Sequence, residues 1–265
     1  MTTPEDPNLA TRLRAAAFYQ ESEQRIGRAW FRSMSRFLDR IRPTVLSGGQ
    51  IDPGRVSDAQ QFWSDEVDVR VVPEVRRTLD QVLSRITRRP AERDTWVSDY
   101  LNSAGNRMKN IPDEVYGLIV AEIERGISEG TGIPGIAEQI DIILRANGSE
   151  RWPNRAVVVA RTETAGAVNA GVFHGAVLDA QNRGDVAPFK VWISTEDQRT
   201  RPTHVAADQQ RTLLSQPFRV GGAPLMFPGD PRGPANEVIQ CRCTMLPIVL
   251  GETIDWTNRQ FKESD

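Results

Sequence analysis

Four residues in the second half of the chain have side chains that could bind a metal. His204 and Asp208 stand four apart, so on a helix they would share a face. Cys241 and Cys243 stand two apart, so in an extended segment both sulfurs would point to the same side. Imidazole, carboxylate and thiolate are all zinc ligands. These four residues therefore form a candidate zinc site.

The favoured interpretation of the same residues is structural. One residue between two cysteines is a tighter spacer than zinc sites usually have, and a disulfide across it would close a strained ring. We therefore expect two reduced, packed thiols, a His204 that ties its loop to a sheet, and no metal or other cofactor. A thiol–imidazole nucleophile has less support, because the sequence indicates neither a lowered thiol pKa nor an oxyanion hole.

Further polar residues surround this group along the chain. Arg161 and Glu163, two apart on a predicted helix, do not face each other, so each needs a partner elsewhere in the fold. Arg199 and Arg201 could grip a phosphate, but we expect them to bond carboxylates and loop carbonyls. We predict one polar cluster that locks the fold and has no catalytic role. With Cys241 and Cys243 beside it, it comprises Arg161, Glu163, Asn169, Asp197, Arg199, Arg201, His204 and Asp208.

The elements that must position these residues are helices followed by strands. A helix from about 153 to 180 carries Arg161, and its many small residues would let another element approach closely. Two helices are predicted before it, from Pro112 to Gly130 and after Pro134. The stretch Phe189–Ile193 alternates as a strand does, and 245–250 reads as a strand with an edge proline. Pro202 suits the first turn of a helix, whereas the glycines and prolines of 221–231 indicate mostly ordered loop.

The first 110 residues read as amphipathic helices. Apolar positions recur at steps of three and four over 9–41 and 58–89, and a further segment precedes Pro112. Pro73 should begin a helix or kink one. No motif in this part carries chemistry, so we interpret residues 1–110 as a helical bundle or docking arm. Residues 111–255 form the second domain, and 256–265 a peripheral tail.

Composition narrows the class of protein. The net charge is −2, which argues against a protein that coats DNA through bulk electrostatics. The longest apolar runs are far shorter than a membrane span, and the polar N-terminus gives no sign of a secretion signal. Two neighbouring cysteines without another partner indicate a reducing compartment.

Four motifs in a fixed order carry a specific resemblance. They are Ala160-Arg-Thr-Glu-Thr164, the segment from Asp197 to His204 after a strand, Pro228-Gly-Asp-Pro231, and Cys241-Arg-Cys243. Together, over roughly residues 112–250, they resemble the phage Mu F-like head-morphogenesis domain. Two positions depart from that pattern. Gln240 stands where the family usually has Asn, and Asp208-Gln209 where it often has Asp-Gly.

The resemblance implies an α+β fold and a role in the phage head. An N-terminal helical region would precede a mixed α/β domain with a small sheet and long ordered loops. The protein would be a low-copy minor capsid component bound to the portal or inner capsid, acting in head assembly or in DNA packaging or ejection. Its partner would be the portal protein, and the major capsid protein, a scaffold protein and packaged DNA would be further candidates. It would not bind a membrane. It would reside in the virion head, and in the host cytoplasm during assembly, and would not be an enzyme.

One enzymatic alternative remains open, an ADP-ribosyltransferase-like effector packaged in the head. Mu F-like domains are distantly similar to ribosyltransferase-type folds. Such an enzyme needs an arginine, a Ser or Thr on a strand and a late glutamate to grip NAD. The chain offers Arg161, Ser194-Thr195 and Glu237 for these roles, at a spacing that does not favour the assignment.

Overall fold

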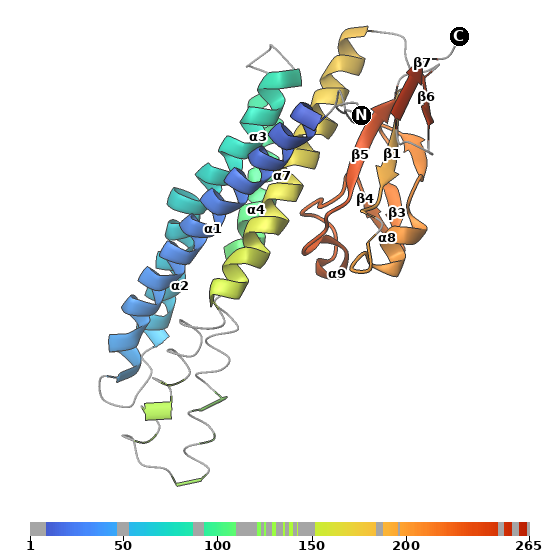
Figure 1. The fold of residues 1–265 in the computed structure, drawn as a ribbon. Helices are drawn as coiled ribbons and strands as arrows, with labels where there is room; N and C mark the ends of the chain where they lie inside the picture. Colours follow the sequence, from blue (N-terminus) through green and yellow to red (C-terminus); the bar gives the residue numbers. More distant parts are fainter. Residues whose placement is uncertain are drawn as a thin grey trace, which may run out of the picture. The chain divides into compact units, whose positions relative to one another are not determined.

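The computed structural model describes most of the chain in six longer stretches (Figure 1). These are residues 9–46, 53–86, 93–109, 152–183, 188–195 and 197–248, with 252–255, 260–263 and a few single positions between 121 and 142. The helices predicted over 112–130 and after Pro134 lie largely outside the described residues. Within them, no helix is both long and apolar enough to cross a bilayer. The fold is α+β with an N-terminal helical region, as predicted.

Two compact units divide the chain, and neither is continuous in sequence. The first comprises Met1–Val75 and Leu101–Ala160, and the second Arg76–Tyr100 and Arg161–Asp265. Residues 76–100 are therefore grouped with the C-terminal part, although the sequence assigned them to the N-terminal arm. Three helices each contribute residues to both units, namely α3 (Val72–Ile86), α4 (Arg93–Lys109) and α7 (Trp152–Arg183).

The first unit is built on α1 (Leu9–Leu46) and α2 (Pro53–Glu66). Trp30 of α1 and Trp63 of α2 are fully buried and meet edge to face, with ring centroids 6.1 Å apart. The indole nitrogen of Trp63 donates to the carbonyl of Met108 at 3.2 Å. A buried indole with a satisfied N–H anchors a core well, because it buries a large apolar surface at no polar cost.

A π-helical turn, η1 (Val67–Val71), joins α2 to α3 and precedes Pro73. The amide of Val72 donates to the carbonyl of Val67, five residues back. Proline lacks an N–H and disrupts the usual bonding of the preceding turn, so a local change of helix type before it is expected. The prediction that Pro73 marks a helix start or kink is confirmed.

The second unit contains the sheets. Strand β1 (Phe189–Ile193) lies between β2 (Arg211–Leu213) and β5 (Thr244–Ile248), and both pairings are antiparallel. Pro247 sits on β5, an edge strand, which is where a residue without an N–H is tolerated. Strands β6 (Glu252–Asp255) and β7 (Gln260–Glu263) pair separately. The predicted strands at 189–193 and near 245–250 are confirmed.

The stretch predicted as mostly loop contains a hairpin, which is a correction. Strand β3 (Phe218–Val220) pairs with β4 (Ala223–Leu225) across Gly221 and Gly222. Both glycines have positive φ, +57° and +83°, as a tight two-residue hairpin turn requires. Strands of three residues are too short to show an alternating pattern, so the glycine pair was the sole available signal.

Helix α7 provides the closely packed face that its small residues predicted. A Cβ on Gly166 would lie 3.1 Å from the carbonyl oxygen of Gly229, and one on Gly171 would lie 2.8 Å from Val82. These approaches bring the Pro228–Pro231 motif and α3 directly against the helix. The run from Thr162 to Gly171 is buried throughout, so α7 is the central support of the second unit.

Candidate functional site

His204 is held by a short helix, α8 (Pro202–Ala206). Pro202 occupies its first turn, as predicted, since a residue there needs no backbone donor. The imidazole is 2% exposed and meets Trp192 of β1 edge to face, at 5.5 Å between ring centroids. The helix ends at Ala206, so Asp208 does not share a helical face with His204, contrary to expectation.

The two cysteines lie in the segment that leads into β5. Gln240 turns the chain with a φ of +56°, and its amide donates to Oγ1 of Thr162 on α7 at 3.0 Å. Nδ2 of Asn169, also on α7, donates to the carbonyl of Cys243 at 3.0 Å. These two bonds fix the backbone on either side of Cys241, and both cysteines are free and buried.

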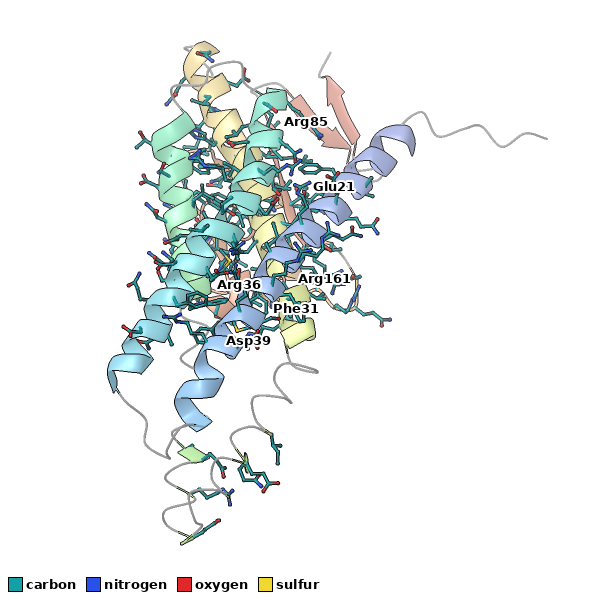
Figure 2. All side chains as sticks on the ribbon, turned by 90° about the vertical axis from the view of Figure 1, so that its left-hand side faces the viewer. Glu21, Phe31, Arg36, Asp39, Arg85 and Arg161 are labelled. Carbon is teal, nitrogen blue, oxygen red and sulfur yellow. The ribbon has the colours of Figure 1, made fainter. Side chains whose placement is uncertain are left out.

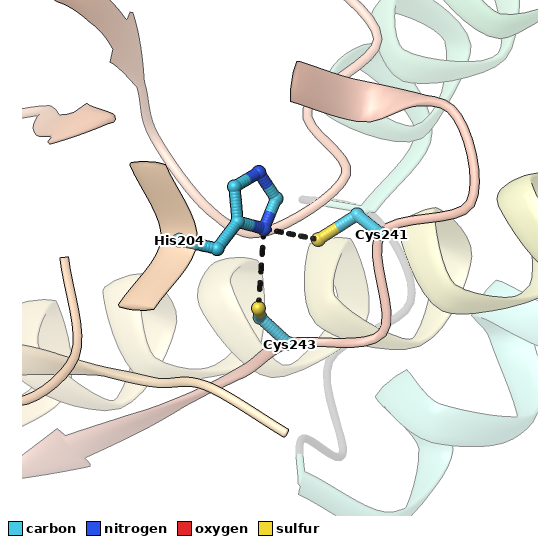
Figure 3. A group of neighbouring side chains, drawn as sticks. All are labelled: His204, Cys241 and Cys243. Atoms are coloured by element: carbon cyan, nitrogen blue, oxygen red, sulfur yellow. Dashed lines mark hydrogen bonds between the residues drawn. The ribbon is translucent and has the colours of Figure 1, made fainter. Parts of the chain in front are cut away.

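The imidazole and both sulfurs converge in the second unit (Figure 3). Nδ1 of His204 lies 3.3 Å from Sγ of Cys243 and 3.7 Å from Sγ of Cys241. All three possible ligand atoms lie within 4.8 Å of one another. Three residues from two separate segments therefore present nitrogen and sulfur atoms to a common point.

Glu237 completes the arrangement from α9 (Ala235–Val238). Nε2 of His204 donates to its Oε2 at 3.1 Å, and Oγ1 of Thr203 donates to the same oxygen at 2.8 Å. Nδ2 of Asn236 donates to Oε1 at 2.9 Å. A carboxylate can only accept, so Nε2 carries a proton and Nδ1 is the atom that faces the sulfurs.

The two thiols differ in acidity. The pKa of Cys243 is lowered to about 5, first by the hydrogen bond from Cys241 and then by the hydrogen bond and charge of His204, against the effect of burial. The pKa of Cys241 is raised well above its usual value by its bond to Cys243 and by burial. Cys243 is therefore the more acidic of the two thiols, which the sequence did not indicate. With a residue exposure of 4%, however, it lacks the access that reactive cysteines have.

Other predicted members of the polar cluster lie around this centre in smaller groups. The carboxylate of Asp197 accepts from both terminal nitrogens of Arg242 and from the amide of Arg199. The guanidinium of Arg201 donates to the carbonyl of Ile239. Both arginine contacts are to the chain's own carboxylate and carbonyl groups. They hold the segment before β5 against the loop after β1.

Asp208, Arg161 and Glu163 are the three remaining residues of the predicted cluster. Asp208 accepts from the amide of Ser194 at 2.7 Å, and so it joins its turn to the end of β1. Arg161 is exposed on α7 (Figure 2), whereas Glu163 on the same helix is 2% exposed. The polar residues thus form several local groups, and the buried His–Cys–Cys centre is one of them.

The Pro228–Pro231 motif contains a buried carboxylate, Asp230, which the sequence analysis did not single out. Asp230 is 2% exposed and accepts from the amide of Met226 and from the side chain of Arg232. Near it the fully buried Lys190 donates to the carbonyl of Met226 at 2.7 Å. Burial lowers the pKa of Lys190 to about 7, against the attraction of Asp230. A lysine inside an otherwise apolar strand was the signal available for this group.

Glu237 was singled out from the sequence only as a carboxylate for NAD. Its contact with His204 could not have been foreseen, because the two lie 33 residues apart and meet through two short helices. In the alternative enzymatic set, Oγ1 of Thr195 donates to the carbonyl of Arg242, and Ser194 is buried.

Residues 118–246 match the family model described as Phage Mu protein F like protein. Over 184 residues the chain is 27% identical to the NAD(+)–arginine ADP-ribosyltransferase EFV of Enterococcus faecalis. That match covers 66% of this chain and 35% of the relative, so the chain spans about a third of the relative's length. No solved structure matches the chain.

Proposed function

Residues 118–246 of this chain belong to the phage Mu F-like family, and from that membership we propose that the protein acts in phage head morphogenesis. It is a minor capsid component, present in few copies and bound to the portal or the inner capsid surface. It acts in head assembly or in the packaging or ejection of DNA. The family match carries the proposal, since it includes the whole of the His–Cys–Cys centre.

The chemistry of the site supports a structural role. Glu237 is the carboxylate that ADP-ribosyl transfer would require, yet it is 4% exposed and accepts bonds from Thr203, His204 and Asn236. A carboxylate saturated by its own chain is not free to stabilise a positive transition state on a substrate. Arg242 and Arg201 are likewise engaged with Asp197 and the carbonyl of Ile239, whereas Arg161, the arginine considered for NAD, is exposed.

The docking surface in this proposal lies on α1. Arg28, Phe31 and Arg32 are exposed, and the last two lie three and four residues after Arg28, so the three share one side of the helix. Figure 2 labels Phe31 on this helix. An exposed aromatic between two arginines is a common feature of protein interfaces, where Arg and Phe are enriched.

A pull-down against the portal protein of the same phage tests this proposal. The full chain should retain the portal, and a variant with Arg28→Glu, Phe31→Ser and Arg32→Glu should lose at least 10-fold in affinity. Arg219→Glu reverses an exposed charge on β3 and is the matched control, which should bind as the parent does. Equal binding by the parent and the α1 variant would remove α1 as the docking surface, and no binding by the parent would count against portal association.

A second candidate is ADP-ribosyl transfer, which the similarity to the Enterococcus faecalis transferase favours. Because the match covers 35% of that protein, the residues that give it its activity can lie outside the shared part. We expect His204→Ala and Glu163→Ala to impair folding or incorporation into heads, with no NAD cleavage by the parent chain to lose. If either variant folds and assembles normally while an NAD cleavage activity of the parent disappears, the structural role is refuted.

A further inference from the structure

We propose that His204, Cys241 and Cys243 bind one zinc ion, through Nδ1 of the histidine and both cysteine sulfurs (Figure 3). The sequence made zinc the less favoured alternative and included Asp208 among its ligands. In the structure the group consists of the other three residues, and the carboxylate of Asp208 instead accepts from the amide of Ser194. The structure also brings a ring nitrogen of His204 and both sulfurs together, which simple packing of two thiols would not require.

The distances fit a tetrahedral ion. Zinc lies about 2.1 Å from a nitrogen ligand and about 2.3 Å from a sulfur ligand, so tetrahedral angles set the two ligand atoms about 3.6 Å apart. The observed separations between Nδ1 and the two sulfurs are 3.3 and 3.7 Å, which bracket this value. On the nitrogen–sulfur distances, an ion could therefore enter with small shifts of the three side chains.

The atom of His204 that faces the sulfurs is the one available for a metal. Glu237 accepts from Nε2, so Nδ1 supplies the lone pair to a metal, whose binding displaces any proton on that atom. A carboxylate behind a metal-bound histidine is the usual outer partner, because it fixes the ring and makes the ligand nitrogen more basic. Glu237 is itself fixed by Thr203 and Asn236, so the ring has little freedom to turn away.

The backbone around the cysteines is also held in advance. The amide of Gln240 is bonded to Thr162, and the carbonyl of Cys243 to Asn169, so α7 fixes the segment that bears both sulfurs. Two thiolates and an imidazole select zinc over magnesium or calcium, which prefer oxygen ligands. Among the described residues the group supplies three ligands, which leaves the fourth position of the ion to water.

A zinc ion here would add to the hydrogen bonds that already join these segments, such as those of Thr203 and His204 to Glu237. It would connect α8 to the stretch before β5, while the outer partner Glu237 adds α9. All three ligand residues are at most 4% exposed, so the protein shields the ion from bulk solvent. The proposal is independent of the head role, because it concerns how this unit is stabilised.

Metal analysis of the purified full chain gives the first test. Protein made in zinc-supplemented medium should contain one zinc per chain after gel filtration, as should the control Asp208→Asn, which keeps an oxygen acceptor for Ser194. Cys241→Ser and Cys243→Ser should each reduce the bound zinc to background. Absence of zinc from the parent, or full retention by both serine variants, would overturn the proposal.

A second measurement does not depend on the folding of the serine variants. Cobalt added to metal-free parent protein should give the intense visible bands of a tetrahedral site and a thiolate-to-cobalt charge-transfer band. Zinc should then abolish both and protect the two thiols from alkylation. Glu237→Gln should retain one site but weaken zinc binding by about 10- to 100-fold. Octahedral cobalt spectra, or a Cys241–Cys243 disulfide found by mass spectrometry of the parent, would refute the zinc site.

Discussion

Gly166 of α7 and Gly229 of the Pro228–Pro231 motif approach each other so closely that a Cβ on either would press against the backbone of the other. A Cβ on Gly229 would lie 3.0 Å from Cα of Gly166, and a Cβ on Gly166 would lie 3.1 Å from the carbonyl oxygen of Gly229. The nearby Tyr100 hydroxyl limits Gly166 from another direction, at 3.0 Å. The Pro228–Pro231 motif therefore serves packing, because its glycine lets the loop lie directly against α7.

Replacing Gly229 should consequently destabilise the second unit. Gly229→Ala introduces a methyl group against backbone atoms and also strains a residue whose φ is +79°. The matched control is Gly222→Ala, where φ is +83° but no atom lies within 4 Å of the added Cβ. The control should lose about 1 kcal/mol from the positive φ alone, and Gly229→Ala roughly 2–4 kcal/mol. Urea unfolding of both variants measures the difference, and equal losses would show that the contact is not tight.

Asn169 links α7 to the entry of β5 and should not tolerate a negative charge. Its Nδ2 donates to the carbonyls of Ala165 and Cys243, while its Oδ1 accepts from Thr244. Asn169→Asp has nearly the same shape but turns two attractive contacts into repulsive ones in a fully buried place.

The loss of unfolding free energy should be roughly 2–4 kcal/mol at neutral pH, because a buried group loses its partners and a carboxylate is desolvated. Asn182→Asp changes an exposed residue of the same helix and should alter stability by less than about 0.5 kcal/mol. Thermal unfolding followed by circular dichroism would distinguish them. Similar melting temperatures for the two variants would contradict the role given to Asn169.

Long periodic elements could be predicted from the sequence, and contacts between distant segments could not. Helix α7 and strand β1 were predicted because apolar spacing and small residues report local structure directly. The bond between His204 and Glu237 depends on how α8 and α9 pack, which no local pattern encodes. The strands β3 and β4 could not be predicted either, because a strand of three residues is too short to show an alternating pattern.

Lys190 should make the unfolding free energy of the protein increase with pH. Its pKa falls from an ordinary 10.5 to about 7, because the amine is buried, with Phe173 and Phe218 over it and Asp230 as the opposing charge. Between these two values the unfolded chain binds more protons than the folded one. The unfolding free energy therefore rises with pH through this window, and below pH 7 the cost of burying the charge is fully present.

The variant Lys190→Met removes this titration while keeping an unbranched side chain. The parent's unfolding free energy should rise, relative to that of the variant, as pH increases from about 7 to 10. Taking the difference between the two proteins cancels the titration of every other group. A difference that stays constant over this range would mean that the amine keeps an ordinary pKa in the folded protein.

The two departures from the Mu F-like sequence pattern fall on the two described non-glycine residues with positive φ. Gln209 has a φ of 62° and stands where the family often has Gly, and Gln240 has a φ of 56° and stands where it usually has Asn. Glycine and asparagine are the residues that adopt this left-handed conformation most readily. The glutamines at these two positions therefore strain the backbone locally. Both of their side chains are exposed.

Restoring the family's residues should stabilise the protein. Gln209→Gly and Gln240→Asn should each raise the unfolding free energy by roughly 0.5–1 kcal/mol, because relief of the left-handed strain exceeds the entropy that the new residue costs. Gln216 is exposed and does not have a positive φ, so Gln216→Gly should instead destabilise by about 0.5–1 kcal/mol. The two stabilising changes lie in separate turns and should add in the double variant. A loss of stability at position 240 with a gain at 209 would indicate that the glutamine at 240 makes a contact that asparagine is too short to make.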